Sequence, residues 1–158
     1  MIFDDYKVIS TCFYVKDEER YKKFKDLAWA NNLHFFDKED DNGRMIHAFE
    51  FSGFFTGIDN KFLTNDELNT FAEEHGDDDG DSLFLFSLSK VIADDSFCVL
   101  VRVYGEEDDN EKKAEVDSVI KPNHFDIVEL FDNSKEFLKN NGLTLNDLVF
   151  PYANVANQ

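Results

Sequence analysis

The chain has 158 residues, with 34 Asp and Glu against 16 Lys and Arg, which gives a formal net charge of −18. This charge disfavours direct binding to nucleic acid or to anionic lipid, because both kinds of binding depend on Lys and Arg. Hydrophobic residues make up 42% of the sequence and include 18 Phe, so the chain has enough apolar mass to fold as one domain despite its charge.

The first predicted elements are a strand and a helix. Residues 6–15 alternate and are rich in β-branched and aromatic side chains, which predicts a strand that has on one side Ile9, Phe13 and Val15. Asp17 is placed to cap a helix. Apolar residues then recur at helical spacing at Tyr21, Phe24, Leu27 and Ala28.

A β-hairpin is expected next. Residues 33–39 and 44–52 flank Asn42-Gly43, and Asn-Gly is the strongest short signal for a two-residue hairpin loop, since both residues tolerate positive φ. This loop would place Phe36 opposite Phe49.

The same pairing separates the two histidines of the hairpin. It puts His34 opposite Phe51 and His47 opposite Lys38, which leaves the two imidazoles several pairs apart. We therefore expect each histidine to be satisfied locally rather than to act as a metal ligand or a base.

A second helix and two strands follow. Thr64 and Glu67 form the pattern of a capping box, which predicts a helix that reaches about Glu74. Residues 82–90 and 96–104 are apolar on both faces, so we expect two central strands of the sheet.

The last third of the chain has a weaker pattern. It predicts a strand over residues 125–131 and a helix from about Ser134 to Asn141, followed by an apolar segment from Leu143. The order β-α-β-β-α-β-β resembles a ferredoxin-like split βαβ core. We expect a single acidic α+β domain over residues 1–158, with an antiparallel sheet and two main helices in a core over 1–105 and a smaller C-terminal β/α extension over 106–158.

Motifs for catalysis and cofactors are missing from the sequence. Its seven glycines form no phosphate-binding pattern. If Gly80 is aligned with the glycine of a calcium loop, His75 and Phe86 fall at the first and last ligand positions, where neither can serve. Cys12 and Cys98 match no metal or redox spacing, and we expect reduced thiols. We predict no catalytic residue, no cofactor and no metal site.

The location of the protein is predicted from two further features. No apolar run approaches the ~20 residues needed to cross a bilayer, and the first residues lack the basic and apolar regions of a signal peptide. We expect a cytoplasmic protein that does not bind membranes.

The negative charge is unevenly distributed. Residues 1–31 contain six acids and six bases, whereas residues 32–158 contain 28 acids and 10 bases and carry the whole charge of −18. Two acidic runs stand out as a candidate partner-binding surface. They contain Glu73, Glu74, Asp77, Asp78, Asp79 and Asp81, and Glu106, Glu107, Asp108, Asp109 and Glu111.

Carboxylates on a rigid surface can take the place of phosphates, and interleaved aromatic side chains can anchor a partner. The sequence therefore favours a non-enzymatic inhibitor that binds a basic nucleic-acid-binding protein as a nucleic-acid mimic. Proteins of this physical type include phage anti-defence proteins, such as anti-restriction and anti-CRISPR inhibitors, and immunity proteins against toxic nucleases. The alternative is a non-catalytic regulatory or interaction module whose charge serves only solubility.

Overall fold

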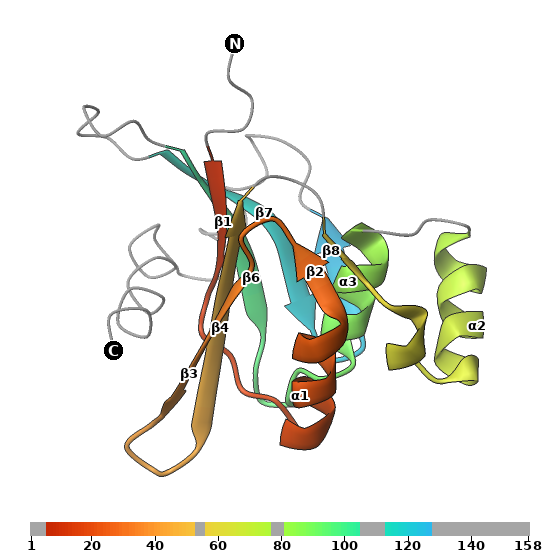
Figure 1. The fold of residues 1–158 in the computed structure, drawn as a ribbon, viewed down its shortest axis with the longest axis horizontal. Helices are drawn as coiled ribbons and strands as arrows, with labels where there is room; N and C mark the ends of the chain where they lie inside the picture. The colour runs from red at the N-terminus through yellow and green to blue at the C-terminus, as the bar shows by residue number, and fades with distance from the viewer. Residues whose placement is uncertain (1–5, 53–55, 77–80, 105–112, 128–158) are drawn as a thin grey trace.

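The computed structural model describes residues 6–52, 56–76, 81–104 and 113–127, which form an α+β fold (Figure 1). Six strands make one antiparallel sheet in the order β3-β4-β1-β6-β7-β8. Its strands are β1 (Tyr6–Ser10), β3 (His34–Glu39), β4 (Met45–Ser52), β6 (Cys98–Tyr104), β7 (Lys113–Lys121) and β8 (His124–Ile127).

Three helices lie on one side of this sheet, and α2 is the outermost of them (Figure 1). They are α1 (Glu18–Leu27), α2 (Asn65–His75) and α3 (Asp81–Ser89). Between α1 and α2, a two-stranded antiparallel sheet of β2 (Ala28–Ala30) and β5 (Thr56–Ile58) precedes the short helix η1 (Asn60–Phe62).

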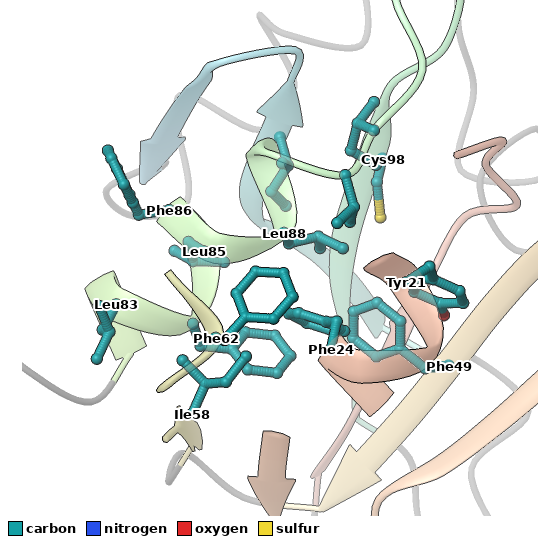
Figure 2. Packing of buried hydrophobic residues seen from close by; sticks show 14 of the residues in the cluster. Tyr21, Phe24, Phe49, Ile58, Phe62, Leu83, Leu85, Phe86, Leu88 and Cys98 are labelled. Atoms are coloured by element: carbon teal, nitrogen blue, oxygen red, sulfur yellow. The ribbon is translucent and has the colours of Figure 1, made fainter. Parts of the chain in front are cut away.

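The core between the sheet and the helices is largely aromatic (Figure 2). Phe24 of α1, Phe49 of β4 and Phe84 of α3 are fully buried. The rings of Phe24 and Phe84 lie 5.3 Å apart, and those of Phe49 and Phe84 lie 5.8 Å apart in an edge-on arrangement. Burying each Phe contributes about 1.5–3 kcal/mol, so these contacts fix α1 and α3 against the sheet.

The helix starts agree with the sequence prediction. The carboxylate of Asp17 accepts hydrogen bonds from the backbone N–H groups of Glu19 and Arg20. Thr64 and Glu67 form both hydrogen bonds of the capping box. These contacts span three residues or fewer, which is why a local pattern predicts them.

The prediction of a strand over residues 82–90 was wrong, because this segment forms α3. All residues from Ser82 to Ser89 are buried, so no polar face reveals the helical period. A short run that is apolar on every side is compatible with a buried helix or a buried strand. The described residues consequently contain three α-helices, where two main helices were expected for the core.

The region predicted as an extension contributes two strands to the main sheet. β7 pairs with β6, and β8 pairs with β7. The sequence pattern indicated β8 but not β7, where an extra residue between Val116 and Ser118, opposite the Leu100–Val101 step of β6, interrupts the alternation. The helix expected from Ser134 to Asn141 and the apolar segment from Leu143 lie outside the described residues.

The first strand is interrupted at Thr11. The Thr11 N–H donates to the Val99 carbonyl at 2.9 Å, and the Thr11 hydroxyl accepts from the Val99 N–H at 2.9 Å. Beyond this point Phe13 pairs with His47 of β4. Val8 joins the main core cluster with Phe13 and Val15, which corrects the prediction that Ile9 shares their side, because the alternation does not continue through Thr11.

The hairpin of β3 and β4 has a different register from the one predicted. Phe35, not Phe36, lies opposite Phe49. Asp40 pairs with Arg44 around a three-residue loop that ends at Gly43, whose φ is +81°. The Asp40 carboxylate accepts from the N–H groups of Asn42 and Arg44, which stabilises this longer loop over the two-residue Asn-Gly turn.

Candidate functional site

The first acidic run begins on α2, the outermost helix. Asp66, Glu73 and Glu74 are exposed, and α2 contains no Lys or Arg. The opposite side of the helix is apolar: Phe71 is buried, and its ring lies 5.2 Å from that of Phe86 in α3. The packing therefore fixes α2 with its acidic side toward solvent.

Two further contacts hold α2 in place. Near its start, Glu67 forms an ion pair with Arg20 of α1. Burial alone raises the pKa of Glu67, but the hydrogen bonds from Arg20 and Thr64 outweigh burial and lower it. At its end, the half-buried ring of His75 stacks on Phe125 of β8 at 5.0 Å. The acidic side of α2 is thus presented on a rigid support.

The rest of the predicted acidic set is only partly described. Asp81 is the first residue of α3, and its Oδ1 accepts from the N–H of Thr56 at 3.0 Å and from its hydroxyl at 2.7 Å. Thr56 is 6% exposed, so Asp81 links α3 to β5 and is not only a surface charge. The other predicted residues lie outside the described part of the chain: Asp77, Asp78, Asp79, Glu106, Glu107, Asp108, Asp109 and Glu111.

A second cluster, which the sequence did not reveal, surrounds His47 on β4. His47 is 3% exposed, and both of its ring nitrogens face carboxylates. Nδ1 lies 2.6 Å from Asp37 of β3, and Nε2 lies 2.8 Å from Glu18 of α1. The observed register creates this cluster, because it places His47 opposite Asp37, whereas the predicted loop would have placed it opposite Lys38.

Charge and aromatic contacts complete the His47 cluster. Lys25 donates to Asp37 at 3.0 Å. Burial alone raises the pKa of Asp37, but hydrogen bonds from His47 and Lys25 outweigh burial and lower it. The Tyr21 ring lies 4.5 Å from the imidazole. Burial, together with the charges of Asp37 and Glu18, raises the pKa of Tyr21 and keeps its phenol neutral.

The arrangement around His47 is suited to holding the fold together. Because both ring nitrogens are occupied by carboxylates and the ring is buried, neither nitrogen is open to a substrate. Glu18 and Asp37 lie at opposite nitrogens of the ring, so they do not converge on one point as metal ligands would. Among the described residues, no group of three or more His, Cys, Asp or Glu could hold a metal ion.

Two of the four basic residues of α1 form ion pairs, and the other two are exposed to solvent. Arg20 and Lys25 form ion pairs with Glu67 and Asp37, while Lys22 and Lys23 are exposed. Since α2 carries exposed acids and no Lys or Arg, the surface charges of these two helices differ. The exposed side of α1 thus carries both signs of charge, with Lys22 and Lys23 beside Glu19 and Asp26, whereas that of α2 carries negative charge without Lys or Arg.

Comparison with known proteins assigns this chain to no family and no fold. No family model, curated protein sequence or solved structure matches this chain. In the described part of the chain, no helix has both the length and the apolar character that a membrane span requires.

Proposed function

We propose that this protein is a non-enzymatic acidic inhibitor that binds a basic nucleic-acid-binding protein in place of its nucleic acid. The observation that supports this proposal is the acidic side of α2, where Asp66, Glu73 and Glu74 are exposed on a helix without Lys or Arg. A helix fixed by Phe71 and Glu67 holds these carboxylates at set distances, so little ordering is lost when a partner binds.

The physical basis is long-range attraction combined with local anchoring. A net charge of −18 attracts a basic surface over roughly 8 Å at physiological salt and raises the encounter rate. Single exposed ion pairs contribute only ~0–1 kcal/mol. Several carboxylates must therefore act together, as the successive phosphates of a nucleic-acid backbone do.

The target would be a nuclease or another nucleic-acid-binding effector. An anti-defence protein of a phage and an immunity protein against a toxic nuclease both fit this chemistry. We place the activity in the cytosol, which agrees with the absence of a disulfide between Cys12 and Cys98.

We also infer that β1, α1, β3, β4, the α2–α3 pair and β6 correspond to a ferredoxin-like core. Support comes from the strand order β3-β4-β1-β6 with antiparallel neighbours and from helices on one side of the sheet (Figure 1). Such folds have many unrelated functions, so the functional proposal does not depend on this inference.

The proposal is tested with immobilised protein and nuclease-treated lysates of candidate host or competitor cells. We compare the wild type with Glu73→Lys/Glu74→Lys, and use Asp41→Lys/Asp94→Lys as a control with the same change of charge at exposed positions. We expect basic proteins to be captured by the wild type and the control but much less by the α2 variant. Each captured protein is then tested for weaker binding to DNA or RNA when the wild type is added.

Two results would contradict the proposal. One is retention of naked DNA or RNA by this protein at physiological salt. The other is capture of basic partners that leaves their binding to nucleic acid unchanged, which would indicate an interaction module of another kind.

A further inference from the structure

Trp29 is an exposed aromatic side chain on a small, well-anchored sheet. It is the only Trp of the chain and is 55% exposed. Its neighbours in β2, Ala28 and Ala30, pack against the core. Because strand residues alternate between faces, Trp29 lies on the outward face of the sheet that β2 forms with β5.

Gly57 lets the indole lie close to the backbone of β5. The two residues are directly opposite in the register. A Cβ at Gly57 would lie 2.3 Å from Cζ2, 2.4 Å from Cε2 and 2.7 Å from Nε1 of Trp29. On either side of Gly57, Thr56 and Ile58 are each 6% exposed, so this platform is fixed in the core while the indole above it remains open to solvent.

Two exposed acidic residues lie close to β2 along the chain and across the β2–β5 pair. Asp26 lies three residues before Trp29, within about 11 Å of chain, and is exposed. Asp59 is also exposed, and its N–H donates to the Leu27 carbonyl at 3.1 Å, which places it beside the end of α1. Lys61 is the exposed base nearest in sequence to Asp59, so two carboxylates and one ammonium lie along these segments.

We propose that Trp29, held on Gly57, is the anchor for an arginine side chain of the basic partner; this rests on the proposed function and deepens it. An exposed indole attracts a cation through its ring electrons, and the planar guanidinium of Arg stacks on such a ring better than the ammonium of Lys. Nearby Asp26 and Asp59 add negative charge. The site therefore selects arginine, whereas the acidic side of α2 attracts any cation.

The fluorescence of Trp29 reports directly on this site because the chain has no other Trp. The protein is titrated at low salt with nona-arginine and, separately, with nona-lysine. We expect nona-arginine to change the emission of Trp29 and to bind about threefold to tenfold more tightly than nona-lysine. An emission that stays constant while labelled nona-arginine binds, as measured by anisotropy, would overturn the proposal.

Substitutions separate the anchor from general charge attraction. Trp29→Ala removes the indole, and Gly57→Ala keeps it but displaces it, since the added Cβ overlaps the ring. Gly57 does not have a left-handed φ, so alanine is compatible with its backbone. We expect both variants to lose the preference for nona-arginine, and Phe97→Ala, at another exposed aromatic residue, to retain it.

The outcomes distinguish this inference from the proposed function. Circular dichroism confirms that each variant is folded, and Trp29→Thr, which removes the ring but is favoured in strands, replaces Trp29→Ala if the latter unfolds. Equal preference for nona-arginine in the wild type and the Gly57→Ala variant overturns the anchor. If the anchor fails while partner capture still depends on Glu73 and Glu74, the proposed function stands without it.

Discussion

Helices α1 and α2 use charge in opposite ways. On α1, Glu18, Arg20 and Lys25 contact partners on β4, α2 and β3 respectively. On α2, Asp66 and Glu73 are exposed. Within the described residues, this helix forms one ion pair with Lys or Arg, between Glu67 and Arg20. These three charges of α1 therefore hold the helix to neighbouring elements, whereas the exposed carboxylates of α2 remain available to a partner.

The largest loss of stability is expected at His47. His47→Ala leaves the carboxylates of Glu18 and Asp37 facing each other across a cavity, which should lower the free energy of unfolding by about 3 kcal/mol. Urea denaturation at pH 6 measures this loss. The control is His124→Ala, which removes an exposed pair with Asp126 and should cost less than about 0.5 kcal/mol. Equal losses of stability for both variants would show that the His47 cluster does not hold the fold together.

A smaller loss is expected at Asp81, which lies in the acidic run but contacts β5. Asp81→Ala leaves the N–H and the hydroxyl of buried Thr56 without this acceptor, and the expected cost is about 1–2 kcal/mol. Asp126→Ala, at an exposed carboxylate, serves as the control. We therefore expect that reversing the charge of the whole run reduces stability if Asp81 is included and not if it is left intact. Asp81→Ala with the stability of the wild type would contradict this role.

The contact of Asp37 with His47 and with Lys25 of α1 should make stability depend on pH. Its pKa is lowered below the usual 3.8 by His47 and Lys25, which outweigh burial. The stabilisation that the Asp37 carboxylate gives to the folded protein is therefore fully present above pH 3.8. It is lost as the pH falls through the lowered pKa of Asp37. Asp37→Asn should reduce stability by about 1 kcal/mol at pH 6, and the difference from the wild type should shrink toward pH 3. Urea denaturation at pH 6, 4 and 3 measures this trend, and a difference that does not vary with pH would contradict it.

The smallest effect on stability is expected on α2. Glu73→Lys/Glu74→Lys should change the free energy of unfolding by no more than about 0.5 kcal/mol, because both residues are exposed and Lys is favoured near a helix C-terminus. The same variant should slow association with a basic partner by roughly tenfold at low salt, and less at high salt. Stopped-flow association at two salt concentrations tests this. A loss of binding that salt does not change would indicate a local structural role instead.

Features that depend on nearby residues or on composition alone could be predicted from the sequence. The Asp17 cap and the capping box of Thr64 and Glu67 involve residues that are close in the chain, so their patterns predict them. Net charge is a sum over residues and needs no fold. The presence of a hairpin near Gly43 was predictable for the same local reason.

Features that depend on contacts between distant parts of the chain could not be predicted from the sequence. The choice of helix for α3 follows from burial on all sides by segments far away in the chain. The register of the hairpin is a local exception: short-range hydrogen bonds of Asp40 favour a longer loop than the Asn-Gly pattern indicated, and a shift by one residue exchanges the partner of every strand residue. That shift brings His47 to Asp37, and the packing of α1 then adds Glu18. No periodicity in the sequence encodes such a meeting of three elements, since each carboxylate is at least ten residues away from the imidazole along the chain.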